Sequence, residues 1–175
     1  MNRDLKNFES KFPLRMKLKA GFWWFTQNTI FPFFLFPSSL RVVTLRLFGA
    51  EIGKSVLIRN GVRIHFPWNL KIGNDCWIGE QVWLINHELI DIGSNVCISQ
   101  RAIICASGHD LRSENLAYKH EPIKIQDGAW ICLQSTILAG SSIGRNSVVS
   151  AGETFKGNLS DDSIFANKQT KKIDW

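Results

Sequence analysis

The sequence has few cysteines and no paired arrangement of them. Its four cysteines, Cys76, Cys97, Cys105 and Cys132, form no C-x-x-C motif and no zinc-like spacing. This argues against a disulfide framework and against a cysteine-ligated zinc site. We therefore expect four free thiols that pack as small, mostly buried side chains, in a reducing compartment such as the cytoplasm.

Charge is absent from residues 20–40, although residues 1–19 hold six Lys or Arg and two acidic residues. An uncharged run of 21 residues is long enough to span a bilayer. However, the polar residues 26–29 and two prolines, Pro32 and Pro37, interrupt it, and no convincing cleavage site accompanies it. We expect no simple transmembrane helix. Two alternatives stay open: the segment covers an open end or flank of the main domain, or its aromatic and basic residues lie in a membrane interface.

The remaining composition indicates one globular domain. The chain has 175 residues, of which 45% are hydrophobic, and a net charge of +6. That charge suits an anionic ligand, an acidic membrane surface or nucleic acid, without choosing among them. Within an N-terminal segment, residues 1–50, we expect a short helix over residues 40–48, capped by Ser38 or Ser39 and ended by Gly49. Its only charges are Arg41 and Arg46, which predicts that most of its surface is buried.

From residue 52 onward, an apolar residue recurs at every sixth position. All fifteen such leading positions are apolar, and fourteen are Ile, Leu or Val. A period of six fits neither an α-helix nor an isolated strand, and it is typical of a parallel β-helix. Each six residues supply one short strand and one corner, three such units make a triangular coil, and the leading side chain points inward. The leading positions are Ile52, Ile58 and Ile64; Ile72, Ile78 and Leu84; Ile92, Ile98 and Ile104; Ile125, Ile131 and Ile137; and Ile143, Val149 and Phe155.

The coil lengths place one long insertion. Coils begin at residues 52, 72, 92, 125 and 143, so they run 20, 20, 33 and 18 residues. The longest contains a projecting loop, residues 109–122, and long loops on regular scaffolds tend to carry function. We expect an all-β domain of about four to five coils over residues 51–157, then a C-terminal tail, residues 158–175. Gly and Asn in the corners "IGND", "IGSN" and "IGRN" are expected to adopt positive φ.

The repeat, the single loop entered through "GHD" and the exit sequence "WICLQSTILAGSSIGRNSVVSAG" resemble the hexapeptide-repeat acyltransferases. The similarity is greatest to the sugar O-acetyltransferases of exopolysaccharide synthesis, the colanic acid biosynthesis group, whose entry to the β-helix is matched by residues 45–73. The resemblance implies a left-handed β-helix, a homotrimer with active sites between neighbouring subunits, and acetyl-CoA as the acetyl donor. It implies no metal and no nucleic-acid partner.

The resemblance also assigns residues near the acceptor. His109, at the loop entrance, matches the general base, and Asn86 matches an asparagine near the acceptor. A neutral imidazole is suited to accept a hydroxyl proton at neutral pH. Asp110 could orient His109, although the beginning of a turn is the favoured reading of this residue. His87 could line the acceptor pocket beside Asn86 or stand on a surface corner.

Residues for acetyl-CoA follow from the same resemblance. Trp130 matches a residue at the acetyl-CoA channel, and Ala151 matches a backbone contact to the pantetheine arm. The family's tail usually reads Gly-x-Pro followed by Arg, whereas this chain reads "FANKQTKKIDW". Lys168 and Lys171, with Lys172, stand where basic residues would contact the phosphates.

The other candidates have plainer readings. We assign Arg101 to the binding of an anionic acceptor such as an activated sugar; the alternative is an ordinary solvated surface charge. For Arg112 we favour the solvated surface charge. Cys105 precedes His109 by four residues, but we expect it to pack rather than act as a nucleophile. A zinc site of the carbonic anhydrase type on this fold needs two histidines five residues apart, whereas His109 and His120 are eleven apart.

Three histidines also lie 22 residues apart: His65, His87 and His109. Because the coils advance by 20 residues, each falls two positions further along its hexapeptide, and we expect that they do not stack.

The sequence therefore predicts an acetyl-CoA-dependent O-acetyltransferase that acts on a sugar hydroxyl of a glycan or activated sugar, in exopolysaccharide or surface-glycan synthesis. The alternatives are a non-catalytic trimeric scaffold and an acetyltransferase with another acceptor, such as serine. We expect a cytoplasmic location, with residues 20–40 as a candidate peripheral contact at the inner face of the membrane.

Overall fold

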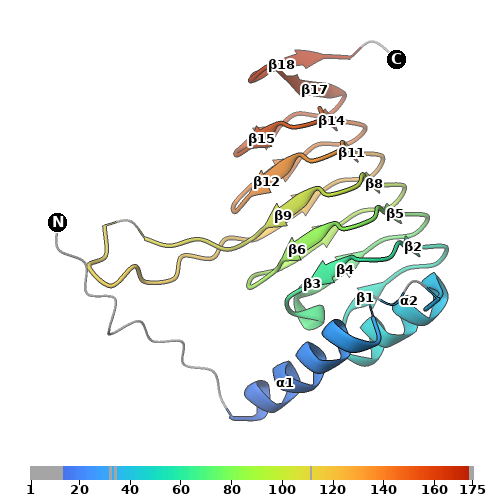
Figure 1. The fold of residues 1–175 in the computed structure, drawn as a ribbon. Helices are drawn as coiled ribbons and strands as arrows, with labels where there is room; N and C mark the ends of the chain where they lie inside the picture. The colour runs from blue at the N-terminus through green and yellow to red at the C-terminus, as the bar shows by residue number, and fades with distance from the viewer. Residues whose placement is uncertain (1–13, 32, 34, 111, 174–175) are drawn as a thin grey trace.

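The computed structural model describes residues 14–31, 33, 35–110 and 112–173. Two helices precede a left-handed parallel β-helix: α1 (Leu14–Thr29) and α2 (Ser38–Leu47). Figure 1 shows both helices at one end of the stack of coils and the C-terminal hairpin at the other. Residues 1–13 of the expected N-terminal segment lie outside the described residues.

The β-helix has three sides, which we call sheets A, B and C. All neighbouring strands within them are parallel, except that β18 pairs antiparallel with β17. Sheet A contains β1 (Glu51–Ile52), β4 (Leu70–Ile72), β7 (Ile90–Ile92), β10 (Ile123–Ile125), β13 (Ser142–Ile143) and β16 (Asn158–Leu159). Sheet B contains β2 (Leu57–Ile58), β5 (Trp77–Ile78), β8 (Cys97–Ile98), β11 (Trp130–Ile131), β14 (Val148–Val149), β17 (Ser163–Ala166) and β18 (Gln169–Lys172). Sheet C contains β3 (Arg63–Ile64), β6 (Trp83–Ile85), β9 (Ile103–Cys105), β12 (Thr136–Leu138) and β15 (Thr154–Phe155).

The predicted register of the repeat is confirmed. All fifteen leading side chains are buried, and each is paired with the leading residue of a neighbouring coil. Ile58, for example, pairs with Ile78, and Ile78 pairs with Ile98. Strands continue beyond residue 157, so five complete coils are followed by two sides of a sixth, formed by β16 and β17.

The corner glycines differ from expectation. Positive φ occurs two residues later, at Asp75 (57°), Asn95 (56°) and Asn146 (52°), which confirms the expectation for these two asparagines but not for the glycine after the leading isoleucine. The glycine is needed for space, because a Cβ on Gly73 would lie 2.6 Å from the carbonyl carbon of Gly93 in the next coil. Small residues at these corners therefore allow the coils to approach closely.

The helices cover the open end of the β-helix, as one of the two alternatives for the N-terminal segment predicted. Trp23 and Phe31 are buried in the same core as the leading residues. The indole Nε1 of Trp23 donates to the carbonyl of Ile64 at 2.7 Å, and Gln27 Oε1 accepts from the N–H of Ile64. These side chains bond to a strand edge that has no preceding coil.

The second helix bonds to the same edge. Ser38 does not cap α2 with its side chain, because Pro37 is the N-cap and Ser38 Oγ accepts from the N–H of Ile58 at 2.7 Å. Arg41 is buried and donates to the carbonyls of Phe31, Phe33 and Ile58. Burial and the nearby Arg59 lower the pKa of Arg41.

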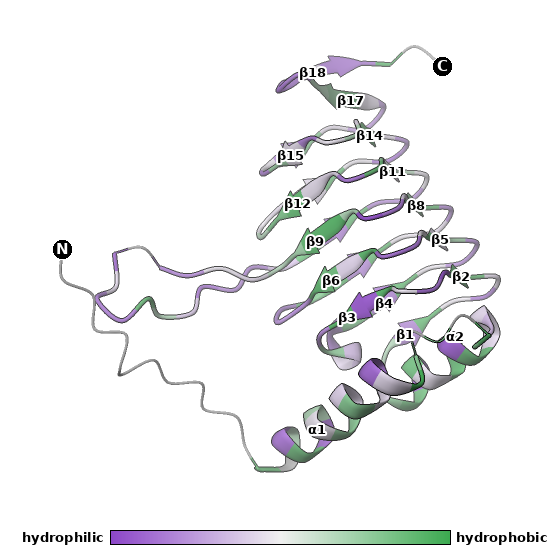
Figure 2. Cartoon of the chain, viewed as in Figure 1, coloured by the Kyte–Doolittle hydropathy of each residue, from purple (hydrophilic) through white to green (hydrophobic). Residues whose placement is uncertain are grey.

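The outer faces of both helices are apolar and exposed, contrary to the expectation that most of α2 is buried. Leu47 is 81% exposed, because α2 lies on the end of the stack and packs on one side only. Figure 2 shows hydrophobic residues along both helices. Within the described part of the chain, no helix is long and apolar enough to cross a membrane.

Candidate functional site

The long insertion leaves the β-helix after β9 and returns at β10, as the sequence predicted. It projects from the stack as an arm (Figure 1). Its base is held by an antiparallel bridge between His109 and Tyr118, flanked by hydrogen bonds from Asp110 N to Ala117 O at 2.8 Å and from Lys119 N to Gly108 O at 2.9 Å. The arm thereby places His109 in a paired segment rather than in an irregular loop.

The imidazole of His109 is oriented by a backbone carbonyl. Its Nδ1 lies 2.7 Å from the carbonyl oxygen of Leu116, and its ring stacks on Tyr118 with ring centres 5.2 Å apart. Because a carbonyl can only accept, Nδ1 carries the hydrogen in the neutral ring and Nε2 carries the lone pair. His109 is exposed and borders a cleft of about 540 Å³ that is also lined by Asp110, Arg112 and Lys119. This arrangement suits a proton acceptor.

Asp110 begins a turn, which is the reading we favoured. Its Oδ1 accepts from the backbone N–H of Arg112 at 2.9 Å. The thiol of Cys105 donates to the carbonyl of Ser107 at 3.4 Å. All four cysteines are free thiols, and burial raises the pKa of Cys76, Cys97 and Cys132.

Asn86 lies inside the corner between sheets C and A and is completely buried. Its amide nitrogen donates to the carbonyls of Phe66 and Asn69, and its oxygen accepts from the N–H of Phe66 at 3.0 Å. The next residue, His87, places Nδ1 2.5 Å from Ser107 Oγ, at the start of the arm. In the single chain, Asn86 therefore positions the corner on which His87 stands.

His65 and His87 do not stack, as expected, but their rings meet edge to face with an interplanar angle of 62°. The rings of His65 and His87 have centres 5.1 Å apart, and those of His87 and His120 stack at 5.0 Å. His65 and His87 stand on the same corner, between sheets C and A, and their side chains are long enough to span the two-residue offset. His120 joins them because the arm folds back beside this corner.

These rings have lowered pKa values. Burial, followed by the charges of His65, His120 and His109, lowers the pKa of His87 to about 4. Burial is also the main cause for His65, with Arg63 adding to it. Burial and then His109 lower the pKa of His120, while Glu88 acts in the opposite direction. The three imidazoles are therefore neutral at pH 7.

The remaining predicted residues lie elsewhere. Arg101 and Ala151 stand on the corner between sheets B and C, where the guanidinium Nε of Arg101 donates to Gln81 Oε1 at 2.9 Å. Trp130 projects from sheet B, 49% exposed. Lys168 is at the turn of the β17–β18 hairpin, and Lys171 is exposed on β18. Within one chain, sheet C separates His109 and Asn86 from the residues assigned to acetyl-CoA. Arg101, although assigned to the acceptor, lies on the acetyl-CoA side.

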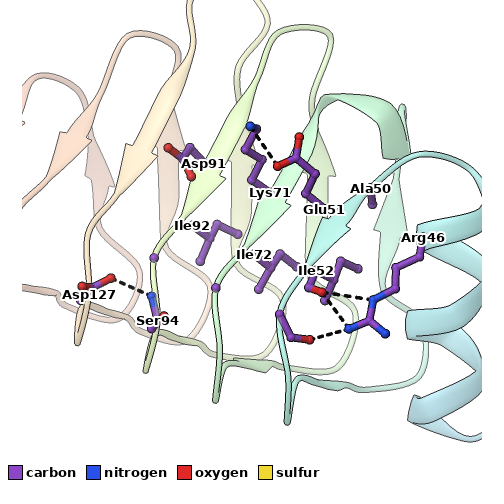
Figure 3. Close-up of a pocket in the computed structure, with 13 residues that line it drawn as sticks. Arg46, Ala50, Glu51, Ile52, Lys71, Ile72, Asp91, Ile92, Ser94 and Asp127 are labelled. Carbon is purple, nitrogen blue, oxygen red and sulfur yellow. Dashed lines mark hydrogen bonds and ion pairs between the residues drawn. The ribbon is translucent and has the colours of Figure 1, made fainter.

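A second hollow, of about 590 Å³, lies over sheet A but contains none of the predicted site residues (Figure 3). Two of its charged groups have partners within it: Lys71 Nζ lies 3.0 Å from Glu51 Oε2, and Asp127 accepts from the N–H of Ser94. Because this hollow contains none of the predicted residues, the candidate site is the cleft beside His109. The residues that the structure describes contain no group of three or more His, Cys, Asp or Glu that could hold a metal ion.

Sequence reasoning missed several residues around His109, namely Ser107, Leu116, Tyr118 and His120. The 22-residue spacing of three histidines was a signal, but a comparison by hexapeptide position alone could not show that the rings of His65 and His87 meet edge to face. Leu116 acts through its backbone carbonyl, and the type of its side chain gives no indication of this contact.

Comparisons with known proteins agree with this geometry. The chain is 38% identical over 137 residues to an Escherichia coli protein named as a colanic acid biosynthesis acetyltransferase, which covers 77% of this chain and 74% of that protein. The fold is similar to that of a hexapeptide-repeat acetyltransferase of Vibrio cholerae, with a TM-score of 0.79, 21% identity, and 91% and 90% of the two chains covered. It is also similar to a galactoside acetyltransferase in complex with coenzyme A, with a TM-score of 0.81, 17% identity, and 97% and 88% covered. No family model matches the chain.

The lowered pKa of His87 predicts a pH-dependent stability. Between pH 6.5 and about 4, an unfolded chain takes up a proton on this histidine that the folded chain does not, so stability falls as the pH falls. His87→Gln removes this difference. Solvent screening at the partly exposed ring reduces the effect. We therefore expect the free energy of unfolding to fall by about 1 kcal/mol less in the variant than in the wild type between pH 7 and pH 5. Urea unfolding at the two pH values measures this; equal losses would contradict it.

Proposed function

The chain belongs to the hexapeptide-repeat acetyltransferases, and we propose that it transfers an acetyl group from acetyl-CoA to a sugar hydroxyl, with His109 as the general base. The observation that carries this proposal is the hydrogen bond between His109 Nδ1 and the carbonyl of Leu116, which leaves the Nε2 lone pair as the proton acceptor. The relatives' names support a sugar acceptor, since they refer to colanic acid biosynthesis and to a galactoside.

The reaction needs no covalent enzyme intermediate. His109 Nε2 takes the hydroxyl proton as the sugar oxygen attacks the thioester carbon, which gives a tetrahedral oxyanion and an imidazolium. The oxyanion then collapses, the carbon–sulfur bond breaks, and the coenzyme A thiolate takes the proton back from the imidazolium. The products are the acetylated sugar and coenzyme A. The carbonyl of Leu116 holds the ring in the tautomer that this sequence requires.

The acetyl-CoA site is proposed to form between two subunits. Ala151 and Lys168 lie along the corner between sheets B and C, whereas His109 lies on the corner between sheets C and A. Acetyl-CoA on the first corner of one subunit meets the base only if a neighbour presents its second corner there. Lys168 and Lys171, on the hairpin above Ala151, are suited to contact the phosphates of coenzyme A.

The outer faces of the sheets support a trimer. Sheet A presents charged and polar residues such as Glu51, Lys71 and Asp91, whereas the outer face of sheet B presents Leu57 and Trp77, which are 41% and 44% exposed. An apolar outer face on a small protein is typical of a protein interface. Closed rotational symmetry about one axis then brings three copies together.

We expect sedimentation of the wild type to give a molar mass three times the 19.9 kDa of the chain. Trp77→Glu places a charge in the proposed interface and should shift the protein toward the monomer, as measured by analytical ultracentrifugation. Lys124→Glu changes an exposed residue on sheet A and should leave the trimer intact. A wild-type monomer, or a trimer in the Trp77→Glu protein, would contradict the assembly.

His109→Ala tests the base. We expect a fall in kcat of about 10²- to 10⁴-fold, because the hydroxyl proton loses its acceptor, with little change in acetyl-CoA affinity. Coenzyme A release with a panel of glycosyl acceptors measures the rate. Asp110→Asn is the matched control, because it keeps the turn at Arg112 N and should retain activity within about threefold. If Asp110 oriented His109, this substitution would lower the activity far more.

Each outcome separates the proposed enzyme from its alternatives. Full activity in His109→Ala would overturn the assignment of the base. A wild-type protein that does not bind acetyl-CoA would favour the scaffold function. Transfer to serine but to no sugar would move the chain to another acceptor class.

A peripheral membrane contact is the further part of this proposal. Leu14, Leu18, Phe22 and Phe25 recur on one side of α1 and are 58–75% exposed, while Trp23 on the opposite side is buried. The helix is therefore apolar on both faces, and one of these faces has no partner among the residues that the structure describes. Neither α1 nor α2 contains an acidic residue, and Lys17 and Lys19 are exposed beside this stripe. This combination suits an anionic membrane interface.

Co-sedimentation with phospholipid vesicles tests the contact. We expect the wild type to bind vesicles that contain phosphatidylglycerol and to bind pure phosphatidylcholine at least about tenfold more weakly. Replacing Leu18, Phe22 and Phe25 with Ser removes the apolar contact and should lower binding to anionic vesicles by at least about tenfold. Leu133→Ser, an exposed apolar residue on another corner, is the control. Wild-type protein that stays in the supernatant with both vesicle types would rule the contact out.

A further inference from the structure

A continuous row of ring contacts runs from the first coil of the β-helix to His109. We call it the ring row, and it consists of Trp68, Phe66, His87, His120, Tyr118 and His109. Successive ring centres are 4.8–5.2 Å apart along the whole row. His65 lies beside it, 5.1 Å from His87. The row thus crosses the corner between sheets C and A and continues along the arm.

The row joins two hollows. At one end is the cleft of about 540 Å³ beside His109. At the other, His65 and Phe66 line a cavity of about 430 Å³ together with Trp24 of α1 and Arg63. Trp68, the last ring, lies 4.6 Å from the ammonium of Lys19 on α1. A ligand that occupies both hollows must pass over the rings between them, so the geometry fits an extended ligand rather than a single small one.

Core packing accounts for only one end of the row. The core is a column of leading aliphatic residues that continues through every coil, and Trp68 packs against it, whereas Phe66 and Tyr118 do not belong to it. None of the six rings is fully buried, and Tyr118 is 43% exposed. Rings that remain partly exposed at the rim of a cleft are available to a ligand.

The chemistry of the row matches a neutral oligosaccharide. Aromatic rings offer flat apolar faces for the C–H faces of a pyranose. His65, His87 and His120 have pKa values lowered mainly by burial, so each is neutral at pH 7 and has one donor and one acceptor nitrogen. Because Nδ1 of His87 is bonded to Ser107 Oγ and Nδ1 of His120 is buried, Nε2 is the nitrogen of these two rings that is left for a sugar hydroxyl. A sugar hydroxyl is likewise both a donor and an acceptor. Sheet A, by contrast, carries paired charges on its outer face.

We propose that the ring row is the binding platform for the acceptor's glycan chain, and that consecutive sugar residues lie along it from the cavity at α1 to the hydroxyl at His109. This inference rests on the proposed function for its chemistry at His109. It adds that the acceptor is an oligosaccharide rather than a monosaccharide. It also adds that residues far from His109 determine the binding of this acceptor.

Binding can be measured without transfer. We expect wild type and His109→Ala to bind neutral oligosaccharides by isothermal titration, with affinity that rises from one to four pyranose units in at least one of the cello-, malto- and galacto-series. Phe66→Leu keeps an apolar side chain in the corner but removes the ring. It should weaken binding of the tetrasaccharide by about five- to tenfold and leave the monosaccharide unchanged.

The matched control is Phe165→Leu, the same substitution at a partly buried ring on the opposite end of the stack. It should bind the tetrasaccharide as the wild type does. Thermal melts of both variants check that Phe66→Leu is folded. In transfer assays, Phe66→Leu should raise KM for the tetrasaccharide by the same factor and leave KM for acetyl-CoA unchanged.

The outcomes distinguish the two proposals. Oligosaccharide binding that depends on Phe66 but leads to no acetyl transfer would overturn the enzyme and retain the ring row. Transfer with equal KM for every acceptor length, in the wild type and in Phe66→Leu, would overturn the ring row and retain the enzyme. Failure of the wild type to bind any of the three series would also overturn the ring row.

Discussion

The structure depends on the stacking of one apolar residue on its equivalent in the next coil. Ile58, Ile78 and Ile98 follow one another on sheet B, and the backbone pairs in parallel at each step. A chain that obeys this register must return to the same three positions in every coil. Extra residues can only be added at a corner and directed outward. The coil that contains the arm shows this, because β10 pairs with β7 in register although the insertion separates them.

The same stacking leaves the first coil with an unpaired edge. Here the helices replace the missing coil, through side chains rather than strands. Trp23, Arg41 and Arg46 donate to the carbonyls of Ile64, Ile58 and Ile52, one on each sheet. Every sheet of the first coil is therefore capped, which prevents edge-to-edge pairing with another molecule. The helices that do this expose their opposite apolar faces as a consequence of their position.

The β-helix could be predicted in detail because its interactions recur at a fixed sequence interval. The leading residues and the long insertion follow from the period of six alone. For the candidate site, the sequence predicted only a position, at His109, and the role of this residue stays a prediction. The bond from His109 to the carbonyl of Leu116 forms within a hairpin whose two sides have no repeat, and the contact of His120 with His87 joins the arm to a coil. The glycines were assigned a dihedral role, whereas interatomic space between coils explains them.

The length of the arm is itself an argument about function. The same corner is made by residues 65–69, 86–89, 139–141 and 156–157 in the four other coils, whereas residues 106–122 make it in the coil of His109. Fixing each extra residue costs about 1–2 kcal/mol of conformational entropy. Among the described residues of the arm, none after Ala106 belongs to the core until Ile123 at the start of β10. The arm is therefore held in place by the antiparallel bridge and by the ring contacts of Tyr118 and His120. The same contacts hold His109 and complete the ring row. An arm that only connected two strands would need neither.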